Sequence, residues 1–331
     1  MSEKRYTVGK DLVIELHPDY YPTLKLVNQA IGVRMPIMLE DVPALIHALQ
    51  RAAGDLDGMR RQYEAVFVRQ TFKPEMVRIP AGEFLMGSDP ARDKDARDEE
   101  QPQHIVSLPE YFMSRTPVTN AQYAAFVQAT GYRRPGHWKE GWAPLGQEDH
   151  PVTGIAWYDA ISYCRWLSRA TGEAYRLPSE AEWEKGARGA DGRFYPWGNR
   201  WDAAYCSTLE GGKHETRPVG ACPRGRSPYG LLDMAGNVWE FTVSLWGKYT
   251  PVPHFVYPYD PQDGREKFDA SPQFQRVLRG GSFMDDRCAA RCAFRRCCYP
   301  LFCNCSVGFR VVVAPHSDFV LPDLPMNLWV E

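Results

Sequence analysis

The chain has 331 residues, of which 44% are hydrophobic, and a formal net charge of −2. This length and composition are typical of a globular protein with one large domain and one small one. The balanced charge and the lack of a long basic run argue against nucleic acid as the partner. No apolar run approaches the roughly 20 residues that span a bilayer, so no membrane insertion is expected.

Residues 1–75 are predicted to form a small N-terminal region, an α/β or helical extension of the main domain. Between residues 6 and 40, short apolar runs alternate with proline-containing turns, which predicts one or two short strands and a turn-rich linker. Asp41 and Pro43 then suit the start of a long amphipathic helix over about residues 41–70. Such a helix either packs on the main domain or binds a partner as a coiled element. Nothing in this region points to a family.

The main domain is predicted to begin at Met76. The stretch MVRIPAGEFLMGS, residues 76–88, predicts a strand pair joined at residues 80–82. Thr119 is placed to cap a helix that ends at Gly131. A second helical segment is expected to begin at His150 and to end before Gly172. A third begins with the capping box Ser179-x-x-Glu182, followed by a buried Trp183.

These motifs, in this order, resemble the formylglycine-generating-enzyme type of domain. The resemblance rests on MVRIPAGEFLMGS, RLPSEAEWEKGARG, YPWGN, SPYGLLDMAGNVWEF and the final RGGS…GFRVVV. It covers residues 76–314 and implies an α+β C-type-lectin fold with two main helices, a small antiparallel sheet and extensive loops. Residues 315–331, rich in proline and apolar side chains, are expected to form a C-terminal strap across the surface.

The stretch from Arg279 to Val313 has a strongly biased composition. Six of the nine cysteines lie between Cys288 and Cys305, and no Lys, Glu, Gln, Trp or Met occurs after residue 284 in this stretch. A thiolate cluster for zinc or iron–sulfur is one explanation, but the stretch has no CxxC pair and no His. Disulfides are another, but the opening residues have no apolar h-region that would mark an exported chain. The third is a restricted codon set, because every residue type found here from Asp285 on can be written with a codon ending in C.

The codon interpretation leads to a second resemblance. The stretch is similar to the variable region of the variable proteins of diversity-generating retroelements, in the subgroup with a formylglycine-generating-enzyme-type scaffold. The resemblance implies a variable region at about residues 283–307 in a constant frame that includes Arg279, Arg291, Arg295 and Phe309. It implies a ligand-binding surface made by Asp285, Asp286, Cys288, Phe294, Cys297, Cys298, Tyr299, Leu301, Phe302, Cys303, Asn304, Cys305 and Ser306.

The displayed side chains are apolar, aromatic and thiol-rich, as in patches that bind other proteins. The expected partner is therefore a protein or a cell-surface molecule whose identity is unknown, with Tyr299 and Phe302 as the energetic anchors. Core packing is the alternative for Phe294, Leu301 and Phe302, and burial is expected for Cys292. The absence of an export signal predicts a cytoplasmic or phage-particle location.

The enzymes of the resembling family hold copper on two cysteines just after the GGS motif, because Cu(I) prefers soft thiolates. The matching positions here are Asp285 and Ala290, while Cys288 and Cys292 are three and two residues out of register. The prediction is therefore a non-catalytic binding protein without copper. A copper-dependent oxidase and a thiol-cluster metal-binding protein remain the alternatives.

A structural calcium ion is the remaining cofactor to consider, and no other cofactor is required. In the resembling enzymes, GNVWE-type segments bind calcium through backbone carbonyls and a Glu, as a hard cation requires. Gly236, Asn237, Val238 and Glu240 match this pattern, whereas Cys206 stands where a second site needs Asn. At most one ion is expected, and the alternative is that Glu240 is a salt-bridged structural residue.

Overall fold

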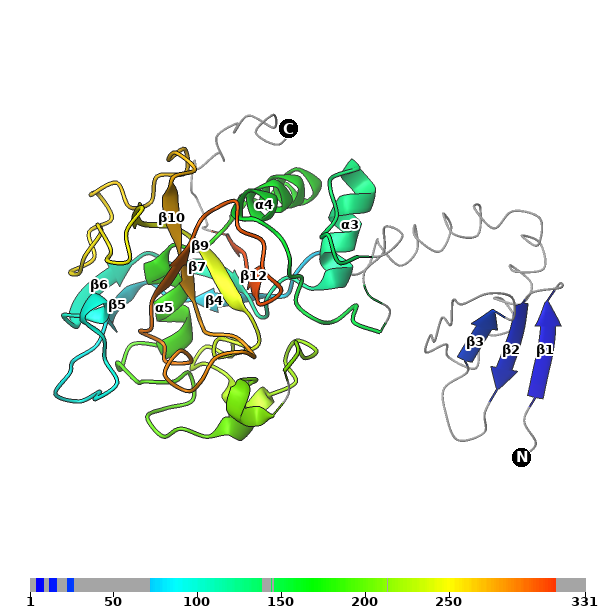
Figure 1. The fold of residues 1–331 in the computed structure, drawn as a ribbon, viewed down its shortest axis with the longest axis horizontal. Helices are drawn as coiled ribbons and strands as arrows, with labels where there is room; N and C mark the ends of the chain where they lie inside the picture. The colour runs from blue at the N-terminus through cyan, green and yellow to red at the C-terminus, as the bar shows by residue number, and fades with distance from the viewer. Residues whose placement is uncertain are drawn as a thin grey trace. The chain divides into compact units, whose positions relative to one another are not determined.

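The computed structural model describes residues 4–8, 12–16, 23–26, 72–138, 144, 146–212 and 214–313 (Figure 1). The chain divides into two compact units, Met1–Thr71 and Phe72–Glu331. The predicted helix at about residues 41–70 and the predicted strap at 315–331 lie outside the described residues. None of the helices in the described part of the chain is both long and apolar enough to cross a membrane.

The described residues of the N-terminal unit are three strands in one antiparallel sheet. They are β1 (Lys4–Val8), β2 (Leu12–Leu16) and β3 (Thr23–Leu26), in the order β1-β2-β3. The expectation of one or two strands was therefore too low. β1 was missed because its sequence, KRYTV, is short and partly charged, and it becomes a strand by pairing with the apolar β2.

Three α-helices of the main unit begin and end largely where the sequence predicts. Thr119 caps α3 (Asn120–Thr130) through a capping box, and Gly131 ends the helix in the left-handed conformation. Ser179 and Glu182 form the predicted box at the start of α5 (Glu180–Arg188). α4 spans Trp157–Thr171. The expected start at His150 was wrong because residues 150–156 are not helical: Pro151 forms a bridge with Thr119, and the backbone N–H groups of Val152 and Gly154 donate to the carbonyls of Val118 and Asn304.

The described strands of the main unit are β4 (Met76–Ile79), β5 (Gly82–Met86), β6 (His104–Leu108), β7 (Tyr111–Ser114), β8 (Tyr175–Arg176), β9 (Trp239–Lys248), β10 (Phe274–Arg279), β11 (Arg296–Cys298), β12 (Val307–Phe309) and β13 (Val312–Val313). They form three sheets, ordered β4-β7-β13-β8, β5-β6 and β11-β10-β9-β12. Among these strands β12 runs parallel to β9, and the other pairs are antiparallel. β4 and β5 are strands as expected, but they do not pair with each other: β4 pairs with β7 and β5 with β6.

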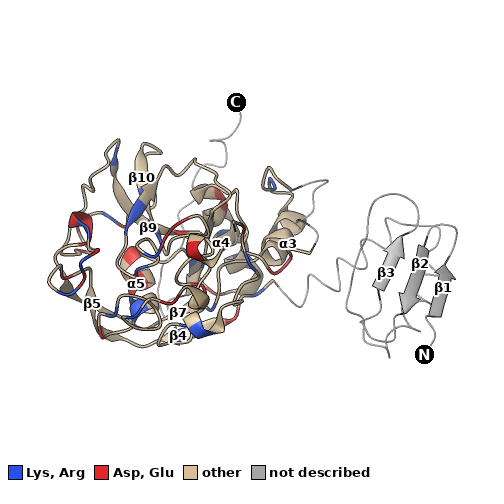
Figure 2. Cartoon of the chain, turned by 60° about the horizontal axis from the view of Figure 1, so that its bottom comes forward, with Lys and Arg blue, Asp and Glu red and all other residues tan. Residues whose placement is uncertain are grey.

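Long loops connect these elements, as the resemblance implied, and short 3-10 helices lie within them. The 3-10 helices are η1 (Asp98–Glu100), η2 (Ala203–Tyr205), η3 (Leu209–Gly211) and η4 (Pro223–Gly225). α4 packs on the core through Trp157, Ile161, Cys164 and Leu167, all buried, which is the face that the sequence predicted. The described part of the main unit thus has an α+β fold, with acidic and basic residues interspersed over it (Figure 2).

Candidate functional site

The biased segment runs from one edge of a sheet to the other. It leaves the inner strand β10 at Arg279, returns as the edge strand β11, and then crosses over to β12 at the opposite edge (Figure 1). Residues 299–306 form this crossing. A segment tied at both edges of a sheet has fixed ends, so its middle can present side chains from a defined backbone.

Four buried arginines anchor the segment to the rest of the main unit. Arg279, Arg291, Arg295 and Arg310 are each at most 2% exposed. Every one of these guanidinium groups pairs with a carboxylate more than 60 residues away in the chain. The partners are Glu184 for Arg279, Glu100 and Asp93 for Arg291, Glu180 for Arg295 and Glu240 for Arg310.

The Arg295–Glu180 pair illustrates the geometry. Nε and Nη2 of Arg295 donate to the two carboxylate oxygens of Glu180 at 2.6 and 2.8 Å, and Nη1 donates to the carbonyl of Glu99 at 2.9 Å. Burial alone would raise the pKa of Glu180, but the positive charges of Arg295 and Arg279 hold that pKa below its usual value. The pair is thus ionised and internally satisfied, which a buried pair requires.

Gly280 and Gly281, at the start of the segment, lie where two backbone stretches approach closely. Gly281 has a φ of +73°, and a Cβ atom there would lie 2.9 Å from the carbonyl oxygen of Ala289. Any larger side chain would push the Ala289 turn outward. Glycine at residue 281 is therefore required by this close approach of the two backbone stretches.

Several side chains predicted for display are exposed. Tyr299, Leu301 and Phe302 are 36%, 45% and 51% exposed, which excludes core packing for Leu301 and Phe302. The other exposed members of the predicted set are Asp286, Cys303 and Cys305, and the half-buried members are Asp285, Cys288, Cys297, Cys298 and Asn304.

Two residues of the predicted set are not displayed. Phe294 is 5% exposed because its ring packs against Trp239, with centroids 5.8 Å apart, and under Arg97. Ser306 is 6% exposed, and its backbone N–H and hydroxyl both donate to the Asn304 side chain. The prediction of display was wrong for both, and the core-packing alternative applies to Phe294. Cys292 is fully buried, as expected.

Sequence reasoning missed two exposed residues that extend the same surface. Met284 is 55% exposed and lies within the variable region. Tyr249, 61% exposed, follows β9, and its ring lies 6.0 Å from that of Tyr299. No local pattern marks Tyr249, because only the fold brings the end of β9 beside the crossing segment.

The two positions that match the copper ligands of the resembling enzymes cannot supply thiolates. Asp285 accepts hydrogen bonds from the Trp239 indole at 2.8 Å and from the Ser282 hydroxyl. Ala290 is fully buried against Tyr195, Cys206 and Ala235. The residues present therefore do not fit a copper ion, which requires soft sulfur donors here.

The neighbouring cysteines do not replace these ligands. Burial raises the pKa of Cys292 to about 12 and that of Cys297 to about 11. Burial thus disfavours the thiolate at both positions, and Cys292 is fully buried, two residues out of register with the copper-ligand position Ala290. Within the described ranges, no group of three or more His, Cys, Asp or Glu side chains is arranged to hold a metal ion.

The residues of the predicted calcium site are engaged elsewhere. The Glu240 carboxylate receives two hydrogen bonds from Arg310, at 2.6 and 2.8 Å, and one from the Trp183 indole at 2.7 Å. Asn237 exchanges two hydrogen bonds with the backbone of Arg217, and Gly236 and Val238 flank it. A cation at Glu240 would face the Arg310 guanidinium, so this residue set does not fit calcium and matches the salt-bridged alternative.

Comparisons with known proteins agree with this scaffold. The model of the sulfatase-modifying factor enzyme 1-like domain matches residues 63–315. The chain belongs to this family.

Among its relatives, hercynine oxygenase from Mycolicibacterium smegmatis is 33% identical over 269 residues, which cover 71% of this chain and 60% of that protein. The formylglycine-generating enzyme of Bos taurus is 30% identical over 294 residues, covering 71% and 74%. The solved structure of Treponema denticola variable protein 1 has a TM-score of 0.57 at 25% identity, covering 72% of this chain and 95% of that one.

Proposed function

We propose that this protein is a non-catalytic binding protein whose exposed crossing segment is diversified by a retroelement. The observation that carries the proposal is a contrast within residues 279–310: some side chains are buried and anchor the backbone, whereas others are exposed to solvent. Four arginines of this stretch, Arg279, Arg291, Arg295 and Arg310, are buried and paired with distant carboxylates, whereas Tyr299, Leu301 and Phe302 are exposed. A frame that does not depend on the displayed side chains allows those side chains to vary at little cost in stability.

The composition of the segment supports diversification as the source of its side chains. All residue types from Asp285 to Val313 can be encoded by codons ending in C, and the six cysteines include no CxxC pair. Their exposures differ, from the buried Cys292 to the exposed Cys303 and Cys305, as expected of residues that are not held together as one thiol cluster. The structural likeness to a protein named as a variable protein supports the same proposal at the level of the fold.

The proposed target is a protein or a cell-surface molecule. Exposed aromatic and aliphatic side chains at Tyr299, Leu301 and Phe302, with Tyr249 beside them, supply apolar area and rigid aromatic anchors of the kind that dominate protein interfaces. The crossing segment, residues 299–306, carries no Lys or Arg, and the exposed arginines of the variable region are Arg287 and Arg296, so the surface lacks the dense positive charge that a nucleic-acid interface needs.

Copper-dependent oxidation of a thiol is the second candidate, because the relatives include formylglycine-generating enzyme. Asp285 and Ala290 stand against it, since neither can donate sulfur to Cu(I). Oxygen consumption with a cysteine-containing peptide and copper distinguishes the candidates, with an active member of the family as positive control. Copper-dependent consumption by this protein would overturn the non-catalytic proposal.

Sequencing of the locus across many cells tests diversification directly. We expect substitutions concentrated in codons 283–307 and constant codons for Arg279, Arg291, Arg295 and Arg310. They should fall at positions that match adenines of a nearby near-repeat, with a reverse-transcriptase gene close by. Six invariant cysteines would instead show that thiols are retained by selection.

The double variant Tyr299→Ala/Phe302→Ala tests display. Both rings are exposed, so its free energy of unfolding should change by about 1 kcal/mol or less, while binding to the cognate target is lost. Phe294→Ala is the matched control, because this buried ring in the same segment should cost about 3–5 kcal/mol. If the double variant unfolds as easily as the control, Tyr299 and Phe302 belong to the core and the proposed surface is wrong.

A further inference from the structure

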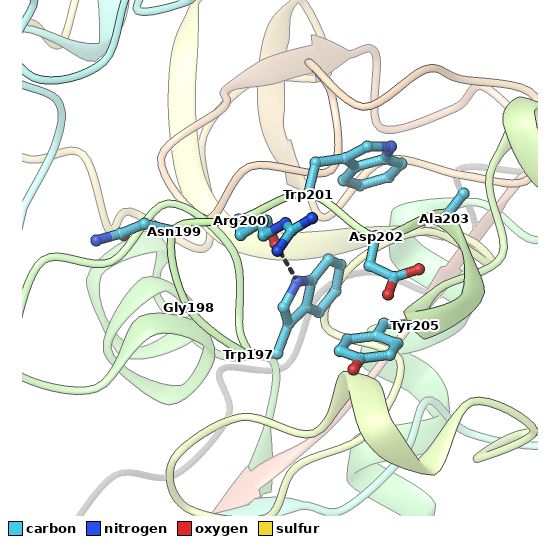
Figure 3. A pocket seen from close by; sticks show the side chains of 8 residues that line it. All are labelled: Trp197, Gly198, Asn199, Arg200, Trp201, Asp202, Ala203 and Tyr205. Carbon is cyan, nitrogen blue, oxygen red and sulfur yellow. Dashed lines mark hydrogen bonds between the residues drawn. The ribbon is translucent and has the colours of Figure 1, made fainter.

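A pocket of about 720 Å³ lies in the loop that follows the YPWGN sequence, outside residues 283–307 (Figure 3). Its walls come from one continuous stretch, residues 197–205, which ends in η2. The lining residues are Trp197, Gly198, Asn199, Arg200, Trp201, Asp202, Ala203 and Tyr205. None of them takes part in the frame or the displayed surface of the proposed binding function.

The aromatic side chains that line the pocket contact a buried residue, Tyr195. Tyr195, only 5% exposed, stacks on Trp197 with an interplanar angle of 9° and a centroid distance of 5.3 Å. Its ring also lies 5.1 Å from Trp201, and Tyr205 meets Trp197 edge-on at 5.7 Å. The Trp197 indole N–H donates to the carbonyl of Arg200 at 2.9 Å. The rings are therefore preorganised, which lowers the entropy cost of binding a ligand.

Polar groups of both signs line the same pocket. Oδ1 of Asp202 accepts the backbone N–H of Ala204 at 3.0 Å, which fixes the carboxylate, and Figure 3 draws that carboxylate between the rings of Trp201 and Tyr205. The exposed Arg200 contributes a guanidinium group to the lining. The pocket thus combines aromatic side chains with a carboxylate acceptor and a guanidinium donor.

We propose that this pocket binds a neutral saccharide ring. A pyranose has a C–H face that packs on an indole and a rim of hydroxyls that both donate and accept, which matches aromatic walls beside Asp202 and Arg200. The charges select against other ligands of this size. An organic cation would be attracted by the rings and Asp202 but repelled by Arg200, and an anion would meet Asp202.

Isothermal titration calorimetry of the full chain with methyl glycosides of glucose, galactose, mannose and N-acetylglucosamine tests the proposal. We expect saturable binding of at least one glycoside, weakened about tenfold or more by Trp201→Ala and by Asp202→Asn. Ile105→Ala, which truncates an exposed apolar side chain on β6 outside the pocket, should leave binding unchanged. Near-ultraviolet circular dichroism of each variant checks that the fold is retained.

Absence of binding for all four glycosides would overturn the proposal. So would choline chloride binding with the same dependence on Trp201, because it would identify an organic-cation site. Equal weakening by Ile105→Ala and Trp201→Ala would show that the effect does not come from the pocket. Tyr299→Ala/Phe302→Ala should not alter glycoside binding, so the outcome is separable from that of the proposed binding function.

Discussion

Replacing Arg295 by alanine should strongly destabilise the main unit, because its guanidinium group neutralises Glu180 in the core. Both side chains are at most 1% exposed, and two charge-assisted hydrogen bonds join them. Removing one member of such a pair leaves the other charge buried without its partner, at a cost of about 3–5 kcal/mol. The lost contact with the Tyr257 ring, 4.3 Å from the guanidinium carbon, adds to this cost.

A loss of this size is large against a total stability of about 5–15 kcal/mol. Urea unfolding at pH 7, followed by tryptophan fluorescence, measures it through the shift of the midpoint at constant slope. Arg296→Ala is the matched control. That neighbouring side chain is 55% exposed and pairs with Asp285 at 3.2 Å, so its removal should cost about 1 kcal/mol or less.

Two results would refute the reasoning. Equal midpoints for Arg295→Ala and Arg296→Ala would show that the buried pair does not hold the segment. A double variant, Arg295→Met with Glu180→Leu, removes both charges and keeps most of the volume, so it should be more stable than Arg295→Ala. If it is less stable, the cost comes from lost packing and not from the uncompensated carboxylate.

Two further predictions concern protons and thiols. Burial raises the pKa of Glu266 from 4.5 to about 7, so the folded state retains a proton that the unfolded chain releases, and this carboxyl makes stability fall as pH rises from 4.5 to 7. Glu266→Gln should reduce that fall in urea unfolding between pH 5 and pH 8, and an unchanged pH dependence would contradict the assignment. The exposed Cys303 and Cys305 should react with a thiol reagent in the folded protein, whereas the fully buried Cys164 and Cys292 should react only after unfolding. Mass spectrometry of labelled peptides distinguishes the two pairs, and early labelling of Cys292 would argue against its burial.

Local signals in the sequence determined most of the helix boundaries, and the resemblance to a known family indicated the fold class. A capping box satisfies backbone donors within four residues, so Thr119 and Ser179 mark their helices without knowledge of the rest of the chain. Gly131, which ends α3, is likewise a local signal that can be read without the rest of the chain. His150 misled because the signals around it are those of an extended segment that precedes the helix, and the first apolar helical residue is Trp157.

Strand pairing required the tertiary structure. Residues 76–86 contain two strands next to each other in sequence, yet each finds its partner elsewhere, β7 for one and β6 for the other. Alternation of side chains predicts a strand, but it does not say which strand lies beside it. β1 (KRYTV) in the N-terminal unit was missed because its short, partly charged sequence becomes a strand only by pairing with β2.

The biased composition between Arg279 and Val313 and the absence of cysteine at residues 285 and 290 were readable from the sequence alone, because they depend on residue identity. Which side chains are displayed was decided only by the fold. The sequence does not distinguish Phe294 from Phe302. In the fold Phe294 is buried against Trp239, whereas Phe302, which follows the edge strand β11, is exposed. Glu240 looked equally suited to calcium and to a salt bridge until Arg310, 70 residues away, was seen to occupy its carboxylate. Strands and helices have a regular side-chain period, but loops do not, so the sequence of a loop-rich segment does not show which side chains share a face. Long-range contacts decide which of them face the core.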